Sequence, residues 1–146
     1  MTTRQETTQL LVTRTLPATR EAVFRAWTQP ALLERWFWPW RPSAKVDLRV
    51  GGSYEISAEH PAIGRLRISG RYIEVVEPER LVFTWNWDGE PGSSETIVTV
   101  TFHARDGATE VVVSHEGFPG SESRDQHEQG WSDVLARLVD AVRDTD

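Results

Sequence analysis

Trp36-Phe37-Trp38-Pro39-Trp40 places three of the chain's seven tryptophans within five residues, between a helical pattern and the first alternating strands. Each large aromatic side chain buries on the order of 150–250 Å². A cluster of this density forms either a corner of the core or the rim of an apolar cavity. Trp85, Trp87 and Trp131 follow in a predicted strand and in the last predicted helix. We therefore expect a sheet and a long helix that enclose an aromatic interior.

Before the cluster, the pattern predicts one strand and two short helices. Leu10–Leu16 has the composition of a strand that ends at Pro17. Thr19 is a suitable N-cap for the first helix. Pro30 fits the first turn of a second helix, Ala31–Trp36, and would break a single continuous one.

After the cluster, apolar residues recur at every second position, which is typical of strands with one buried face. We expect Gly51-Gly52 to form a tight turn, and Gly70 to mark a bulge or a close approach within a strand. Asp88–Ser94 is predicted to be a polar loop. The predicted strands are Lys45–Val50, Tyr54–Ala58, Leu66–Val76, Leu81–Trp87, Ile97–Phe102 and Thr109–His115.

The C-terminal segment predicts a long amphipathic helix, Gln126–Val142, because its apolar residues are spaced by three and four. A sheet needs a cover for its apolar face, and this helix can supply it. The sequence thus predicts an α+β fold in a single domain of residues 1–146, with a flexible N-terminal tail of about residues 1–7.

Composition and charge exclude several classes of function. The chain of 146 residues has no cysteine, which excludes disulfides and thiolate metal sites. Its net charge of −6, without a basic stripe, disfavours binding to nucleic acid through phosphates. No apolar segment approaches the ~20 residues of a membrane span, and the N-terminus lacks the apolar region of a signal peptide. We expect a soluble, cytoplasmic protein that uses no cofactor.

His115 is the main polar candidate for chemistry. It follows Val111 and Val113 at a spacing of two residues along the strand, so all three side chains should face the interior. A lone strand histidine is more often a hydrogen-bonded core residue than a catalyst, so we predict no catalytic residue and keep His115 as the one candidate. Ser114, His115 and Glu116 are consecutive on a strand and cannot form a triad.

A metal site is not expected, because His127-Glu128 lacks the second histidine of a zinc-binding helix. Asp47 and Arg49 are predicted to form an ion pair on the outer face of the sheet. The alternating strand residues leave two interpretations of the interior open: the aromatic rings either fill it or surround a pocket.

Seven short motifs, in order along nearly the whole chain, resemble the family of proteins similar to the C-terminal domain of the activator of the Hsp90 ATPase. The motifs are Glu21-Ala-Val-Phe-Arg-Ala-Trp-Thr, Leu33-Glu-Arg-Trp-Phe, Val46-Asp-Leu-Arg-Val-Gly-Gly, Gly70-Arg-Tyr, Pro78-Glu-Arg-Leu-Val-Phe-Thr-Trp, His115-Glu-Gly-Phe and Gly130-Trp. This family belongs to the START/Bet v 1-like helix-grip (SRPBCC) superfamily. The resemblance implies a curved antiparallel sheet of about six to seven strands around a long C-terminal helix, with a cavity between them for an apolar ligand.

The resemblance favours a pocket over a filled interior, and it is compatible with a homodimer. We predict a non-enzymatic protein that binds a small hydrophobic or amphipathic molecule. The residues predicted to line the cavity are Trp36, Phe37, Trp40, Tyr54, Ile56, Tyr72, Phe83, Trp85, Val98, Val100, Val111, Val113, His115, Phe118, Trp131 and Leu135.

Two other classes of function stay open. The first is an interaction module with a chaperone partner of the Hsp90 type, for which Trp38 and Trp40 would form an exposed apolar patch. The second is an enzyme similar to the polyketide cyclases, which would use His115 as an acid or base.

Overall fold

The computed structural model describes residues 9–88 and 95–144, with the side chains of residues 143 and 144 left out. The predicted flexible tail lies outside the described residues, as does nearly all of the predicted polar loop after Asp88. Within the described part of the chain, no helix combines the length and the hydropathy that a membrane crossing requires.

The described strands form a seven-stranded antiparallel sheet in the order β1-β7-β6-β5-β4-β3-β2. The strands are β1 (Gln9–Leu16), β2 (Ser43–Val46), β3 (Ser53–His60), β4 (Gly64–Val76), β5 (Arg80–Trp87), β6 (Thr96–Arg105) and β7 (Ala108–Glu116). The chain's first strand pairs with its last, so that Val12 lies opposite Val113. The strand number and the antiparallel pairing confirm the predicted sheet.

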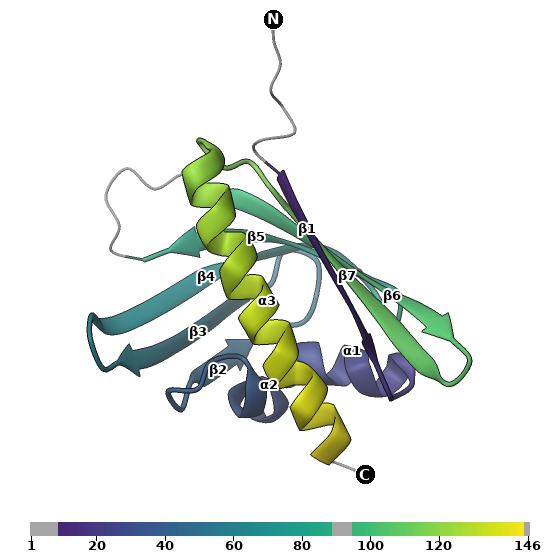
Figure 1. The fold of residues 1–146 in the computed structure, drawn as a ribbon. Coiled ribbons are helices and arrows are strands. Elements are labelled where there is room, and N and C mark those ends of the chain that lie inside the picture. The colour runs from purple at the N-terminus through teal and green to yellow at the C-terminus, as the bar shows by residue number, and fades with distance from the viewer. Residues whose placement is uncertain (1–8, 89–94, 145–146) are drawn as a thin grey trace, which may run out of the picture.

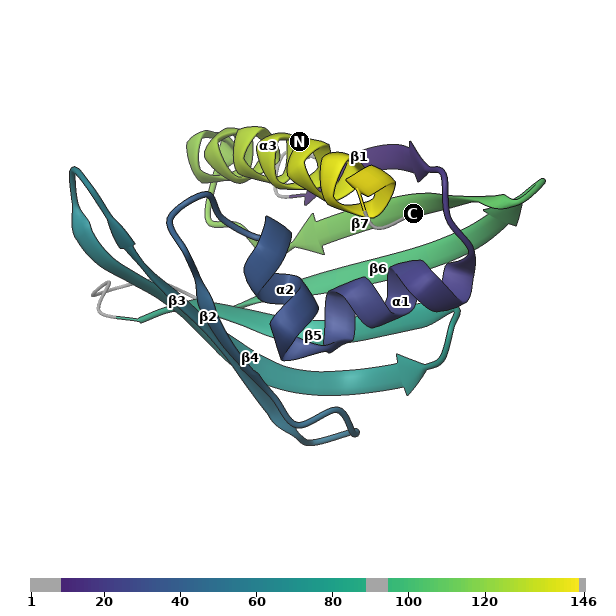
Figure 2. The same ribbon diagram turned by 90° about the horizontal axis from the view of Figure 1, so that it is seen from below.

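The described residues form three helices, which lie on one side of this sheet: α1 (Arg20–Thr28), α2 (Pro30–Trp36) and α3 (Ser121–Asp144). Thr19 caps α1, its hydroxyl accepting a hydrogen bond from the Ala22 amide at 3.2 Å, and Pro30 begins α2, both as predicted. Figure 1 shows α3 running diagonally in front of the sheet. Figure 2 shows the sheet bending around the space that α1 and α2 occupy at one end.

The prediction of a strand through Val50 is wrong. β2 ends at Val46, and Leu48 and Val50 are 37% and 64% exposed. The backbone turns instead, because the Asp47 carbonyl accepts a hydrogen bond from the Arg49 amide at 2.9 Å. A Cβ on Gly52 would lie 2.1 Å from the Asp47 carbonyl oxygen, so only glycine fits this turn. The predicted exposed ion pair of Asp47 with Arg49 is present at 2.9 Å.

Gly70 marks a close approach inside β4, as predicted. A Cβ at this position would lie 2.0 Å from the Thr84 carbonyl oxygen of β5. The ladder between the two strands is interrupted here, since Ser69 pairs with Asn86 and the next paired residues are Tyr72 and Phe83. The register then shifts between Tyr72 and Glu74. The absence of a side chain at Gly70 therefore lets β4 cross close to β5 where the sheet bends.

The last helix begins earlier than its apolar pattern indicates. α3 starts at Ser121, five residues before the predicted Gln126, and its first turn carries Glu122. The first turns are mostly exposed, so they show no apolar periodicity, whereas an acidic residue near a helix N-terminus is favourable. Further along, Trp131, Leu135 and Leu138 are buried against the sheet and the short helices, which confirms the predicted apolar face.

Candidate functional site

A groove separates the first half of α3 from the ends of β3, β4 and β5. It has a volume of about 440 Å³, within the range of small-molecule sites. Its lining residues, among those that the structure describes, include no Asp, Glu, Lys or Arg. They are Phe37, Trp38, His60, Ile63, Leu66, Trp85, Trp87, Ser123, Gln126, His127, Gly130, Trp131 and Val134.

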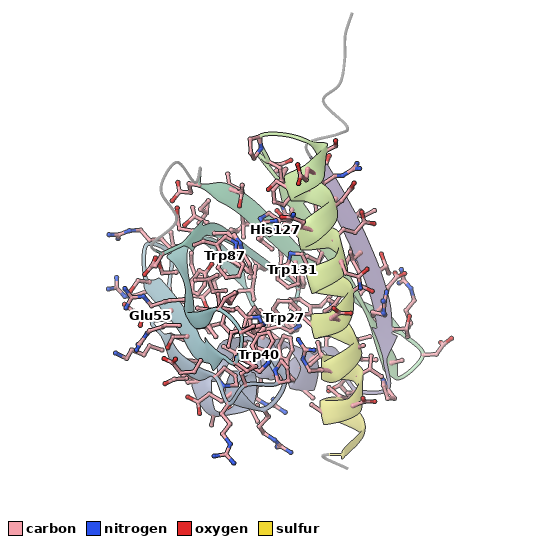
Figure 3. All side chains as sticks on the ribbon, turned by 60° about the vertical axis from the view of Figure 1, so that its left-hand side comes forward. Trp27, Trp40, Glu55, Trp87, His127 and Trp131 are labelled. Atoms are coloured by element: carbon pink, nitrogen blue, oxygen red, sulfur yellow. The ribbon has the colours of Figure 1, made fainter. Side chains whose placement is uncertain are left out.

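A hydrogen bond links the two walls of this groove. The Trp87 indole of β5 donates to Nε2 of His127 on α3 at 2.9 Å. Since Nε2 accepts, Nδ1 carries the proton and donates to the Ser123 carbonyl at 2.9 Å. Trp38 stacks on Trp87, with ring centroids 6.1 Å apart. Figure 3 shows His127 and Trp131 on the side of α3 that faces Trp87, while Glu55 lies on the far side of the sheet.

A second, much smaller cavity lies deeper between the sheet and α3. Its volume of about 20 Å³ is enough for roughly one water-sized group. Phe37, Trp85 and Trp131 line both this inner cavity and the groove. The lining residues are Trp27, Leu33, Phe37, Tyr54, Ile56, Ile68, Tyr72, Leu81, Phe83, Trp85 and Trp131. The interior is thus almost filled by its own rings, and the groove is much the larger of these two spaces.

His115 is fully buried behind the groove, and both of its ring nitrogens have protein partners. The Trp131 indole donates to Nδ1 at 3.0 Å, so the neutral ring carries its proton on Nε2, which lies 2.7 Å from the Thr96 hydroxyl. Burial, and to a smaller extent the nearby His127, lowers the pKa of His115 to about 3. His115 is therefore neutral at physiological pH and orients Trp131.

The two tyrosines belong to the packed interior. The Tyr54 hydroxyl donates to the Thr84 carbonyl at 2.6 Å, close to the bend at Gly70. Burial raises the pKa of Tyr54, with smaller contributions from Tyr72 and Glu95, and burial also raises the pKa of Tyr72. Both side chains are thus held in the neutral phenol form.

The structure divides the predicted cavity residues into three groups. The inner cavity brings together Phe37, Tyr54, Ile56, Tyr72, Phe83, Trp85 and Trp131, of which Phe37, Trp85 and Trp131 also line the groove. Buried residues that line neither space are Val98, Val100, Val111, Val113, His115, Phe118 and Leu135. Trp36 and Trp40 lie elsewhere: Trp36 lines a hollow beside Leu138, and Trp40 is half-buried against His60, with ring centroids 4.5 Å apart. Ligand binding by any of them stays a prediction.

Several lining residues were missed from the sequence. Trp27 of α1 is absent from the predicted cavity lining, although its ring stacks on Trp131 with centroids 5.9 Å apart. Trp87 lies two residues after Trp85 on the same strand, so both side chains point to the same face of the sheet. This spacing could have predicted Trp87 as a lining residue. His127 precedes Trp131 by four residues, which puts both on one face of a helix. Trp38 proves to be 8% exposed, so the exposed Trp38 and Trp40 patch is not formed.

All seven tryptophans form one continuous series of ring contacts. Successive centroids lie between 5.1 and 6.1 Å apart. The order of the rings is Trp40, Trp38, Trp87, Trp85, Trp131, Trp27 and Trp36. This indole series begins at Trp40, just after α2, and passes along the groove and the inner cavity. It ends at Trp36, the last residue of α2.

Residues 9–88 and 95–144 contain no group of three or more histidine, aspartate or glutamate side chains placed to hold a metal ion. The chemistry that the described site offers is therefore that of apolar surface, aromatic faces and a few neutral hydrogen-bonding groups.

Comparison with known proteins identifies the family of this chain. The model of the family described as Activator of Hsp90 ATPase homolog 1-like protein matches residues 17–143. The chain belongs to this family. Its sheet and long C-terminal helix are those of the helix-grip (SRPBCC) superfamily, as the sequence motifs indicated. No curated protein matches the chain.

Solved structures of similar proteins share the fold of this chain. Protein CV1439 from Chromobacterium violaceum is 29% identical, with 92% of this chain and 96% of that chain covered and a TM-score of 0.79. A protein from Rhodobacter sphaeroides is 24% identical over 96% and 95% of the two chains, with a TM-score of 0.82. DynU16, from the dynemicin biosynthetic locus, is 25% identical over 92% of this chain and 47% of its own, with a TM-score of 0.78.

Proposed function

We propose that the protein binds a small hydrophobic or amphipathic molecule in the groove between α3 and the ends of β3, β4 and β5. The observation that carries this proposal is the open volume of about 440 Å³, lined by aromatic and aliphatic side chains. Apolar surface of this kind is stabilised when a ligand removes it from water, at about 25 cal/mol per Å². Membership of a helix-grip family supports the same assignment.

Binding is favoured over catalysis by the state of His115. A general base needs a free lone pair within reach of the substrate. Nδ1 of His115 already accepts the Trp131 indole proton, and Nε2 lies against Thr96. The absence of an exposed Trp38 and Trp40 patch likewise removes the main sequence argument for a chaperone-interaction module. A chaperone partner and a homodimer stay predictions of the family resemblance.

Gly130 offers a direct test, because it lies on the groove wall and a Cβ there would meet no atom within 4 Å. Gly130→Phe is expected to place a ring in the groove, since its Cβ has room on the groove wall. Titration with phenylnaphthylamine, an uncharged apolar fluorophore, should show enhanced emission with the wild-type protein and none with Gly130→Phe.

The matched control is Ala136→Phe, which adds the same ring to an exposed position of α3 that lines neither the groove nor the inner cavity. This variant should bind the fluorophore as the wild type does. Equal binding by wild type and a folded Gly130→Phe variant would place the ligand site elsewhere. No binding by the wild type would overturn the proposal itself.

A further inference from the structure

Two indole N–H groups in the interior have no hydrogen-bond acceptor among the residues that the structure describes. They are Nε1 of Trp27 and Nε1 of Trp85, whose side chains are 5% and 6% exposed, and both rings line the inner cavity. We infer that the ligand of the groove carries an uncharged hydrogen-bond acceptor, such as a ketone, ester or amide carbonyl, which enters the inner cavity and binds these indoles. This inference rests on the proposed function and specifies the chemical class of its ligand.

The contrast with three other indoles of the series supports this assignment. Trp36 donates to the Ala26 carbonyl at 3.0 Å, Trp87 to His127 at 2.9 Å, and Trp131 to His115 at 3.0 Å. The fold therefore supplies acceptors to indoles on both sides of Trp27 and Trp85. A buried donor without an acceptor is unfavourable in the folded protein. Two such donors on rings that line one cavity are explained when a ligand supplies the acceptor.

The groove and the inner cavity share part of their lining. Phe37, Trp85 and Trp131 border both spaces, so a ligand in the groove is already in contact with rings that also line the inner cavity. The inner cavity of about 20 Å³ has room for one oxygen-sized group, while the groove of about 440 Å³ holds the apolar remainder. A ligand with a polar end and an apolar body matches this division.

The acceptor must be uncharged because no basic side chain among the described residues lines the inner cavity that would hold it. Neither the groove nor the inner cavity is lined, among the described residues, by Arg or Lys. His115, whose ring lies 5.2 Å from that of Trp85, stays neutral, since burial lowers its pKa to about 3. A carboxylate buried beside two neutral donors would lose its hydration without gaining a counter-charge. Fatty acids are therefore poorer ligands than ketones or esters of the same length.

The test compares three probes of equal chain length: methyl nonyl ketone, undecane and undecanoate, each measured by displacement of phenylnaphthylamine. The informative quantity is the ratio of the affinities for the ketone and the alkane. It is compared between the wild type and Trp85→Phe, which removes the N–H group and keeps an aromatic ring. The preference should fall by about tenfold in the variant, the value of one hydrogen bond between neutral groups. Trp36→Phe is the control, because the Trp36 indole is satisfied by Ala26 and lines neither space.

A spectroscopic measurement makes the test independent of variant stability. In wild-type protein labelled with ¹⁵N, the indole proton resonances of Trp27 and Trp85 should move downfield with the ketone and not with the alkane, while that of Trp36 stays in place. Equal affinities for ketone and alkane in all proteins, or unmoved Trp27 and Trp85 resonances, would mean that water alone serves these donors and would overturn the inference. Undecanoate binding as tightly as the ketone would overturn the requirement for an uncharged acceptor. Failure of all three probes and of the fluorophore would instead overturn the proposed function.

Discussion

His115 shows how a single buried side chain can couple the site to pH. Its Nδ1 accepts the proton of the Trp131 indole, and Trp131 borders both the groove and the inner cavity. A second ring proton would turn this acceptor into a donor that faces another donor. Burial, with a smaller contribution from the nearby His127, lowers the pKa of His115 to about 3, so the neutral ring is preferred.

This preference predicts a loss of stability in acid. The unfolded chain takes up a proton on His115 near its ordinary pKa of 6.5, whereas the folded protein does so only near about 3. Because the unfolded state binds more protons in that window, the free energy of unfolding falls as the pH is lowered from 6.5 toward 3. The slope due to this residue approaches about 1.4 kcal/mol per pH unit.

His115→Gln is the matched variant, because an amide can replace both hydrogen bonds and does not titrate. Urea unfolding of both proteins between about pH 7 and about pH 4.5 measures the difference, in which the shared carboxylates cancel. The advantage of the wild type should shrink steadily below pH 6.5. A difference that does not depend on pH would contradict the neutral, buried assignment of His115.

At the scale of the elements, the fold could be predicted largely from the spacing at which apolar residues recur along the sequence. The strands, the two short helices and the apolar face of α3 follow from local spacing, which each segment carries by itself. The errors fall where long-range contacts override the local pattern. Val46–Val50 alternates like a strand, yet the Gly51 amide donates to the Tyr72 carbonyl at 2.8 Å, and the part after Val46 forms a loop beside β4. The exposed first turns of α3 carry no period at all.

Two glycine-to-alanine substitutions should shift stability in opposite directions. In β4, Gly70→Ala would place a Cβ 2.0 Å from the Thr84 carbonyl oxygen, and backbone must move to accommodate it. We expect a loss of about 2 kcal/mol or more in the free energy of unfolding. In α3, Gly130→Ala meets open space, so the better helix propensity of alanine should add about 0.5–1 kcal/mol. Urea unfolding measures both, and a Gly70→Ala variant as stable as the wild type would refute the close packing of β4 on β5.

At the scale of the whole molecule, the site was harder to predict than the fold. The motifs placed the aromatic residues between sheet and helix, and Phe37, Trp85 and Trp131 do border the open volume. Strand parity, however, cannot tell whether rings fill an interior or surround a space, because that depends on their rotamers and on the curvature of the sheet. The structure has both: a nearly filled inner cavity and an open groove. The part of the groove that α3 contributes, around His127 and Gly130, depends on a helix docked from the other end of the sequence.

A ligand in the groove should stabilise the whole fold by mass action. At a free concentration about ten times its dissociation constant, phenylnaphthylamine should add about 1.4 kcal/mol to the free energy of unfolding. For a chain of this size that corresponds to a rise in Tm of roughly 3–6 °C. Differential scanning calorimetry can measure the rise, which should be absent in Gly130→Phe and preserved in Ala136→Phe. A Tm that rises equally in all three proteins would show that the dye binds outside the groove.

The indole series also has an optical consequence. Rings at these separations exchange excitation energy faster than they emit, so light absorbed by any of the seven tryptophans is shared along the series before a photon leaves the protein. The tryptophan emission of the molecule should accordingly be strongly depolarised even when tumbling is frozen. A quencher lodged against Trp85 alone would darken its neighbours as well, which makes the chain's own fluorescence a collective reporter of what occupies its interior.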